Sequence, residues 1–378
     1  MGGSRWLPWR RIEWLSRRHI DRRAAELLGL ILTAVLLEVA AAAGLSYVAG
    51  FGSVRAALGR VDWTWLVVVF GALAVSFAGY YSAYGGIYRA EGGYDLNRRQ
   101  LRAVVVAGFG GLFAHGGTTP DDLVLQACGA DRRDSIVRVW TLGGMEQGVL
   151  ALGGCVASIA AVCLHLADPP SDFTLPWVII PVPAGIVAFW VAERYRKGLR
   201  RRSGWLGRLS MFLDSIHLVR KLFAHPLRHR RALGGMAVFW AADAFAIWAA
   251  LAAFGVRLDG VALIVGFCTG MVFTRRIAPL AGAGTLMLVL PVTMWVSGAP
   301  LAVAIAGIFA YRVLCLWLPM PFALASLPAL RQVSKESLVG ASAPLLTVPA
   351  GAPREPMPEP APAIPEPEPA IPETGTTR

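Results

Sequence analysis

The strongest constraint on this chain is a series of apolar segments, each long enough to cross a membrane as a helix. A transmembrane helix needs about 20 residues. Six runs of about this length or more cover residues 25–51, 64–88, 139–166, 175–193, 232–256 and 301–325, and shorter or interrupted runs cover 104–117, 260–274 and 277–297. With 56% hydrophobic residues, 16% charged residues and a mean hydropathy of +0.55, the composition excludes a water-soluble globular domain. We therefore expect an all-α polytopic membrane protein with about eight transmembrane helices.

The two ends of the chain differ from this apolar middle. Residues 1–24 combine seven arginines with three tryptophans, which is typical of a cytoplasmic segment at the membrane interface. Residues 25–330 form the membrane domain. Residues 331–378 are rich in proline and glutamate and have too little apolar surface to offset the entropy of ordering, so we expect this tail to be disordered.

The arginine blocks predict the orientation, because loops rich in arginine and lysine stay in the cytoplasm. Four arginines lie within 89–102, and ten arginines and two lysines lie in the basic loop 194–231. An even number of crossings must separate two cytoplasmic loops, yet three apolar runs lie between them. We infer that the shortest run, 104–117, is a re-entrant segment that enters from the cytoplasm and turns back at its glycines. The N-terminus and the tail are then expected on the cytoplasmic side.

Within the basic loop, apolar residues recur at helical spacing from Trp205 to Val219. This pattern predicts an amphipathic helix on the anionic inner leaflet, where each basic residue contributes on the order of 1 kcal/mol. An ordinary solvated loop is the alternative. Because the net charge of +12 lies in such blocks, the expected partners are membrane lipids and not nucleic acid. The five cysteines lie in or beside apolar runs without CxxC spacing, so the sequence predicts no metal site, and we expect no cofactor.

The second half of the chain repeats part of the pattern of the first. In each half, a segment interrupted by glycines precedes a strongly apolar helix with one ionisable residue, Glu146 in the first and Arg312 in the second. Cys128-Gly129-Ala130 also aligns with Ser297-Gly298-Ala299. Paired broken segments are typical of transporters with a binding site between two repeats. A pseudo-repeat of two halves is therefore one interpretation of the chain.

Ionisable residues inside the apolar runs indicate where a site would lie. A charge at mid-bilayer costs at least about 2.5–3.5 kcal/mol on insertion scales, so such residues face the protein interior or a wet cavity. Arginine suits a phosphate group, carboxylates suit a cationic amine, and broken helices expose N–H groups that bind anions. The candidate substrate cavity comprises Glu146, Arg312, Asp243, Arg276, His115, Asp121, Arg138, Gly116, Gly117, Gly282 and Gly284.

These residues also have structural interpretations. Glu146 with Arg312 or Arg138, and Asp243 with Arg276, are alternatively interior ion pairs that fix helix packing. In the same structural interpretation, Arg138 reaches out to the interface, His115 is a hydrogen-bonded turn residue, Glu38 is a contact between helices, and Asp121 and Asp122 form an N-terminal helix cap.

Several short motifs support a resemblance to a known family. The second half carries Pro279, Gly282, Gly284, Tyr311-Arg312 and Trp317-Leu318-Pro319, Asp243 precedes Phe254-Gly255, and the first half carries Gly116-Gly117 and Cys128-Gly129. On these motifs, roughly residues 25–330 resemble the flippase-like transmembrane domain of the lysylphosphatidylglycerol synthase family, in its stand-alone form. The chain departs from the family at Met287, where the family often has glutamate, and at His115 and Asp121-Asp122, where a proline-glycine-arginine pattern is common.

The resemblance implies movement of a lipid or lipid-linked headgroup across the cytoplasmic membrane of a bacterium. We accordingly expect a transporter and not an enzyme, and the chain has no P-loop lysine motif for ATP hydrolysis. One alternative is a membrane-embedded transferase with His115 or Asp121 as general base. Another is a non-catalytic scaffold that recruits partners through its basic loop and tail.

Overall fold

The computed structural model describes residues 29, 31–111, 119–164, 171–202, 204–272 and 282–321. These residues form helices and no strand, which confirms the all-α prediction. Five helices are long and apolar enough to cross a membrane, and shorter apolar helices accompany them, so the expected number of about eight crossings is not confirmed. The basic segment 1–24 and the tail 331–378 lie outside the described residues.

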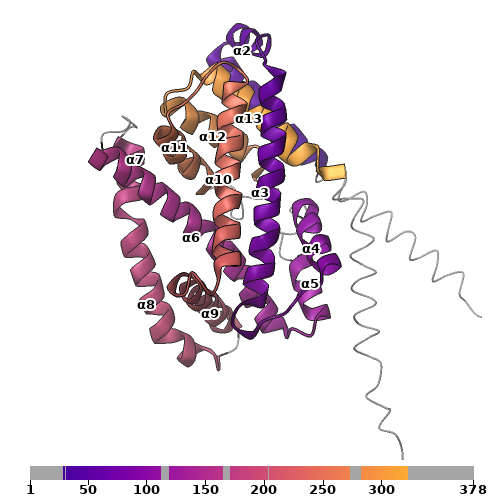
Figure 1. Cartoon of the computed structure of the whole chain (residues 1–378), viewed down its shortest axis with the longest axis vertical. Coiled ribbons are helices and arrows are strands. Elements are labelled where there is room, and N and C mark those ends of the chain that lie inside the picture. The colour runs from indigo at the N-terminus through magenta and orange to yellow at the C-terminus, as the bar shows by residue number, and fades with distance from the viewer. Residues whose placement is uncertain are drawn as a thin grey trace, which may run out of the picture.

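The helices have the following bounds (Figure 1). A first helix, Ile31–Ala49, is followed by α2 (Phe51–Leu58), α3 (Trp63–Arg89), α4 (Arg98–Gly111), α5 (Thr119–Ala127), α6 (Arg132–Leu164), α7 (Ser171–Ile179), α8 (Pro181–Leu199), α9 (Gly204–Ala224), α10 (Arg230–Ala252), α11 (Gly260–Val272), α12 (Thr285–Val296) and α13 (Leu301–Arg312), which continues into a π-helical turn, Val313–Trp317.

Helices α3 and α10 form the centre of the bundle and pack side by side along most of their length (Figure 1). Glycines bring their backbones into contact. A Cβ atom added at Gly235 would lie 2.6 Å from the backbone nitrogen of Ala83, and one added at Gly86 would lie 2.5 Å from that of Ala232. Lipid gives no hydrophobic drive for association, so membrane helices rely on such close packing of small residues.

Helices α6, α7 and α8 form a second layer beside this central pair. With 33 residues, α6 is about 50 Å long and runs obliquely past α10 (Figure 1). Residues Asp172–Leu199 are continuously apolar enough to cross the membrane, with a bend at Ile180 between α7 and α8. Most of this stretch faces outward, since only 11% of its apolar window is buried.

Helix α9 confirms the helix predicted in the basic loop, and the alternative of a solvated loop is wrong. Its apolar face does not lie free, because Leu213, Val219 and Leu222 are buried where α9 packs on α6 and α8. Trp205 and Phe212 stay exposed. The helical spacing was therefore informative, but the protein itself covers most of the face that was expected to meet lipid.

Two pairs of short helices enter the bundle from opposite ends. Helices α4 and α5 pack together beside the lower half of α3, and both the start of α4 and the end of α5 lie at the lower end in Figure 1. Helices α11 and α12 pack together at the upper end, where Leu258 and Gly298 are in contact. Their antiparallel packing places Gly266 near Ser297 and Gly270 near Leu290. Residues 112–118, which join α4 to α5, and residues 273–281 of the connection between α11 and α12 lie outside the described residues.

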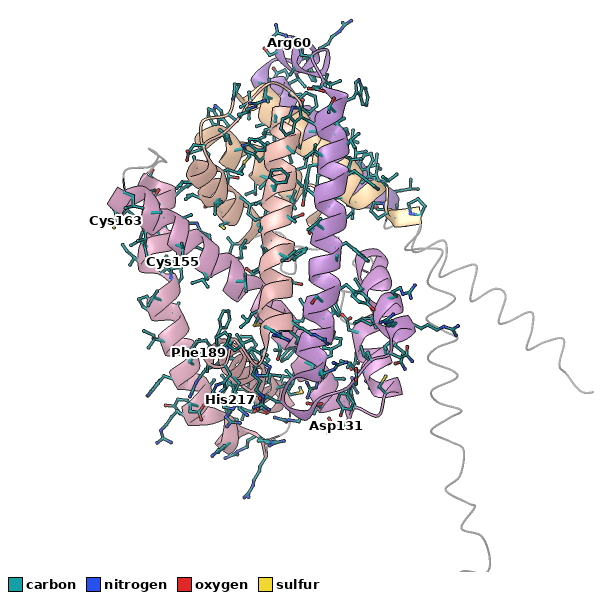
Figure 2. The ribbon with its side chains drawn as sticks, in the orientation of Figure 1. Arg60, Asp131, Cys155, Cys163, Phe189 and His217 are labelled. Atoms are coloured by element: carbon teal, nitrogen blue, oxygen red, sulfur yellow. The ribbon has the colours of Figure 1, made fainter. Side chains whose placement is uncertain are left out.

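The two ends of the molecule differ in charge. Both loops that were predicted to be cytoplasmic lie at one end, where Glu91 of the first loop bonds Lys221 of the second at 2.9 Å. Figure 2 shows Asp131 and His217 at this end and Arg60 at the opposite end. Between the two loops, α6 leads away from the basic end to α7, at the level of α11, and α8 leads back, whereas α4 and α5 remain in the lower half (Figure 1). The even number of crossings between the loops stays a prediction.

One sequence similarity between the halves has a local explanation. At Gly129 and Gly298, φ is 93° and 109°, and the following residue donates its N–H to the carbonyl five positions earlier, Ala130 to Leu125 and Ala299 to Met294, each at 3.0 Å. The end of α10 is the same, with Gly255 at φ 85°. This pattern is the Schellman helix ending. The aligned triplets therefore share a helix terminator that occurs three times in the described residues, and they carry no information on a repeat.

Candidate functional site

Four ionisable side chains lie at mid-depth within the bundle. At about 1.5 Å per residue, Glu38 lies about 17 Å along its helix from Ala49, Asp243 about 14 Å from Ala252, and Arg312 about 17 Å from Leu301. Counted from the basic end, Glu146 lies about 21 Å from Arg132, and the hydrocarbon core of a bilayer is about 30 Å thick. All four are buried, with exposed fractions of 0 to 4%. We call these four residues the mid-depth belt. The predictions of Glu146, Asp243 and Arg312 as interior residues agree with this placement.

Arg312 is paired with Glu38 of the first helix. Its Nε donates to Glu38 Oε1 at 2.7 Å, and its Nη2 binds the same oxygen. Trp317 Nε1 donates to Oε2, also at 2.7 Å. The structural interpretation that paired Arg312 with Glu146 is wrong, because Arg312 is paired with Glu38. The sequence interpretation of Glu38 is a contact between helices, and Glu38 is not among the candidate cavity residues. Its partner Arg312 lies 274 positions away, so nothing local in the sequence predicts the pair.

Glu146 is held by the central helix pair. Tyr80 of α3 donates its hydroxyl to Glu146 Oε1, and Trp240 of α10 donates its indole N–H to the Glu146 backbone carbonyl at 3.0 Å. The Tyr80 ring also packs on Phe239, with ring centroids 4.7 Å apart. These contacts fix a fully buried carboxyl group at the junction of α3, α6 and α10.

Asp243 of α10 accepts a hydrogen bond from Tyr311 of α13 at 2.9 Å. Tyr311 immediately precedes Arg312, so two successive residues of α13 bind carboxylates on two different helices. The belt thus runs across the bundle from α6 through α3, α10 and α13 to the first helix. The side chains of Tyr80, Tyr311 and Trp317 donate hydrogen bonds to the belt carboxylates. The sequence does not predict the role of Tyr80, because a tyrosine in an apolar run is usually an ordinary core residue.

Arg138 has a different position. Its Nη1 binds the carbonyl oxygens of Tyr88 and Ala90, each at 3.1 Å, and its Nε donates to Asp134 at 2.9 Å. The guanidinium also lies 5.4 Å from the centre of the Tyr94 ring. Carbonyls at a helix C-terminus carry partial negative charge, so Arg138 caps α3 at the basic end of the molecule. This placement separates it from the mid-depth belt.

The remaining candidates lie partly among the described residues and partly outside them. Asp121 and Asp122 lie in the first turn of α5, where the helix dipole favours carboxylates, and Asp122 accepts a hydrogen bond from Ser135 of α6, so the capping interpretation stays a prediction. Gly282 and Gly284 have φ of 72° and 76° and form the turn that starts α12, so the predicted break in the second half is present. The residues His115, Gly116, Gly117 and Arg276 lie outside the described residues.

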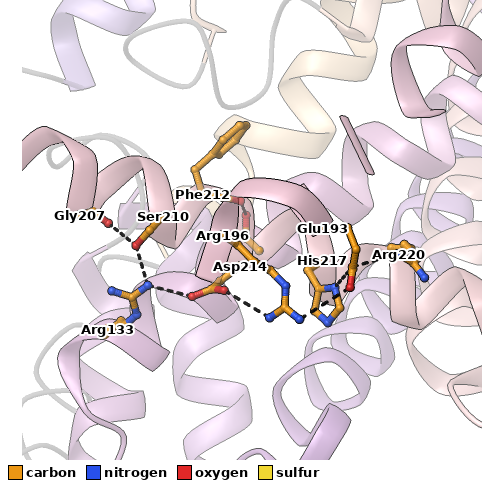
Figure 3. A network of polar contacts seen from close by, with 10 residues as sticks. Arg133, Glu193, Arg196, Gly207, Ser210, Phe212, Asp214, His217 and Arg220 are labelled. Carbon is orange, nitrogen blue, oxygen red and sulfur yellow. Dashed lines mark hydrogen bonds and ion pairs between the residues drawn. The ribbon is translucent and has the colours of Figure 1, made fainter. Parts of the chain in front are cut away.

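An ionic layer joins the helices at the basic end (Figure 3). Arg133 of α6 binds Asp214 and Ser210 of α9 at 2.8 and 2.7 Å. Glu193 of α8 bonds His217 and Arg220 of α9, each at 2.9 Å. These charge-assisted bonds hold α6, α8 and α9 together where the apolar contacts end.

Two histidines in this layer have a lowered pKa. Burial lowers the pKa of His217, with a further contribution from Arg196, and this outweighs Glu193. Burial also lowers the pKa of His229, although Glu91 lies 3.5 Å from its Nε2. Both side chains therefore favour the neutral form more than an exposed histidine does.

The helices and the mid-depth belt define a class: an all-α protein whose long apolar helices are compatible with a membrane and which buries charged groups at mid-depth. Among the residues that the structure describes, no group of three or more His, Cys, Asp or Glu side chains is placed to hold a metal ion. The chain matches no protein-family model, no curated protein sequence and no solved structure.

Proposed function

We propose that this protein moves a lipid or lipid-linked headgroup across the membrane. The observation that carries the proposal is the mid-depth belt, in which α6, α10, α13 and the first helix each place one ionisable side chain near the middle of the bundle. Charges at this depth are costly and rarely serve packing alone. A polar headgroup needs such groups to replace its water as it crosses.

The two pairs of short helices give a second line of support. Helices α4 and α5 enter from the basic end, and α11 and α12 enter from the opposite end (Figure 1). Transporters often combine elements of opposite orientation around a site near the bilayer midplane. The resemblance to the flippase-like domain implies movement of a lipid or lipid-linked headgroup, and the proposed function agrees with it.

In the proposed mechanism, the structure represents a closed state. The belt residues are buried and satisfied by Tyr80, Tyr311 and Trp317, so a headgroup must displace these donors to pass. The arginine then binds the phosphate and the carboxylates bind amine or hydroxyl groups. Alternating openings at the two ends carry the headgroup past the belt while the acyl chains remain in lipid.

The test is a translocation assay with purified protein in vesicles. Phosphatidylcholine vesicles that contain a trace of fluorescent phosphatidylglycerol are treated with an impermeant quencher, and the rate at which inner-leaflet fluorescence is lost is measured. We expect faster loss than in protein-free vesicles, and a drop of at least about tenfold for Glu146→Gln and for Asp243→Asn, equivalent to roughly 1.4 kcal/mol in the barrier.

Asp95→Asn is the matched control, because Asp95 is an exposed carboxylate outside the belt, in an ion pair with Arg89. It should translocate at the wild-type rate. Wild-type protein that fails to exceed empty vesicles with phosphatidylglycerol, other phospholipids and a polyprenyl phosphate would remove the proposal.

A further inference from the structure

Three N–H groups converge on one carboxylate where the first helix meets α13. Two come from the Arg312 guanidinium and one from the Trp317 indole, and together they satisfy both oxygens of Glu38. The Arg312 and Glu38 side chains are only 5% and 1% exposed. The π-helical turn Val313–Trp317 follows Arg312 directly, and π turns inside helices frequently mark functional sites.

The start of α12 lies close to this group. Gly284, the N-cap residue of α12, approaches Leu37, the neighbour of Glu38, so closely that an added Cβ atom would lie 3.2 Å from the Leu37 Cβ. No side chain caps the first turn of α12 among the described residues. Its backbone N–H groups give this end of the helix a partial positive charge. The helix end lies against Leu37, the neighbour of Glu38, and adds partial positive charge to this part of the bundle beside Arg312.

We propose that this group of donors is a binding site for the phosphate of an anionic lipid, and that Glu38 occupies it in the closed state as an internal competitor. The inference rests on the proposed function and specifies its substrate class, a lipid with a negatively charged phosphate group. A phosphodiester and a carboxylate each carry one negative charge and accept parallel hydrogen bonds from a guanidinium. Exchange of one for the other keeps Arg312 paired with one anion, whereas the displaced Glu38 loses its counter-charge.

The packing shows which element moves to admit the lipid. Only 22% of the apolar window of the first helix is buried. Near its start, this helix contacts its neighbours through a small apolar cluster that comprises Ala34, Ala283, Leu316 and Met320, whereas from Ala41 onward it packs on the main core. Outward displacement of the part before Ala41 breaks these few contacts and the bonds to Glu38, and it opens Arg312 directly to surrounding lipid.

The experiment measures binding to the full-length protein in dodecyl maltoside micelles, which contain no phosphate. The probes are dihexanoyl phosphatidylglycerol, inorganic phosphate and, as a control without phosphate, dihexanoylglycerol. Glu38→Gln removes the competing charge and should raise affinity for the phosphatidylglycerol probe on the order of tenfold. Arg312→Gln should abolish binding, and Trp317→Phe, which keeps the ring and removes the N–H, should weaken it several-fold.

Thermal unfolding in the same samples separates binding from folding. Glu38→Gln leaves Arg312 buried without a counter-charge, so its unfolding temperature should fall and should recover when the phosphatidylglycerol probe is added. The double variant Glu38→Gln with Arg312→Gln removes both charges and should show no recovery. If Glu38→Gln binds no more tightly than the wild type, or if Arg312→Gln binds equally well, the proposal is overturned.

Three further outcomes have separate meanings. Inorganic phosphate that binds as tightly as the phosphatidylglycerol probe would overturn the assignment of a lipid ligand. Phospholipid translocation that persists in Arg312→Gln would also overturn this site while leaving the proposed function intact, because Glu146 and Asp243 would then suffice. Tight binding to Glu38→Gln without any translocation by the wild type would support the site and remove the transport function.

Discussion

At the scale of single residues, five buried charges among the described residues have different kinds of partner. Glu38 and Arg312 neutralise each other, Glu146 and Asp243 accept bonds from tyrosine hydroxyls, and Arg138 binds carbonyl oxygens. A buried charge that loses its partner destabilises a protein by about 3–5 kcal/mol. Substitutions at the partners should therefore have effects as large as substitutions at the charges themselves.

The cap of α3 by Arg138 makes a specific prediction about Gly93. A Cβ atom added there would collide with the Tyr88 carbonyl oxygen and with the Arg138 guanidinium. Gly93→Ala should lower the free energy of unfolding by about 2–3 kcal/mol, because it displaces Arg138 from the carbonyls. The adjacent Gly92 has φ 76° but nothing within 4 Å of an added Cβ. Gly92→Ala should then cost only about 1 kcal/mol of backbone strain. Thermal unfolding in detergent compares the two, and equal effects would contradict the capping role.

The lowered pKa of His229 predicts a pH dependence of stability. As pH falls below about 6.5, the unfolded chain takes up a proton at this position before the folded protein does. The free energy of unfolding should therefore fall between pH 7 and pH 5, and His229→Gln should reduce this slope. Circular dichroism melts at several pH values provide the measurement. Stability that rises on acidification would show that Glu91, and not burial, dominates the environment of His229.

At the scale of elements, the seam between α3 and α10 depends on glycine at particular positions. Backbone contact at Gly79, Gly86 and Gly235 brings the two helices together and sets the positions of Tyr80 on one helix and Asp243 on the other. Any residue that separates the helices will therefore also disturb the mid-depth belt. Structure and proposed function are linked through this seam.

Two neighbouring glycines in α10 test the seam directly. Gly235→Ala should destabilise the protein by about 1–3 kcal/mol, since its Cβ would lie 2.6 Å from the Ala83 nitrogen. Gly234 has open space around an added Cβ atom, so Gly234→Ala should be neutral or stabilising by up to about 1 kcal/mol through helix propensity. Unfolding midpoints give the comparison. Destabilisation by both substitutions would point to a general requirement for glycine and not to the seam.

The sequence predicts elements better than it predicts partners. Hydropathy located the long helices, and helical spacing located α9, because both are local properties. It did not predict that Glu38 would bind Arg312, since the two are 274 positions apart and only the fold brings them together. The similarity of Cys128-Gly129-Ala130 to Ser297-Gly298-Ala299 has a local cause, so the pseudo-repeat stays a prediction. A helix ending has a sequence signature of its own, whether or not two halves are related.

At the scale of the whole molecule, charge separates one end from the other. The end with Asp131 and His217 carries the ionic layer and most of the arginines of the basic loop, while Arg60 lies at the opposite end (Figure 2). Such asymmetry is characteristic of proteins whose basic loops remain in the cytoplasm. We therefore expect α4 and α5 to enter from the cytoplasm and α11 and α12 to enter from outside.

Cysteine labelling in cells tests this orientation. In a chain whose native cysteines are replaced by serine or alanine, Arg60→Cys should react with an impermeant maleimide in intact cells. Arg201→Cys should react only after permeabilisation. The ratio of labelling before and after permeabilisation is the measurement. The reverse pattern would place the basic end outside the cytoplasm and invert the predicted topology.

The shortness of α12 has a consequence for the surrounding lipid. Its 12 residues extend only about 18 Å, although the side chains of Leu288 and Trp295 are exposed on its outer face. Helix α6, with 33 residues, is about 50 Å long, which exceeds the thickness of the hydrocarbon core. Hydrocarbon adjusts to the protein it touches, so the annular lipids beside α12 should be compressed relative to those beside α6. A headgroup in a compressed leaflet starts nearer to the opposite surface. Longer acyl chains in the host membrane should consequently slow its passage.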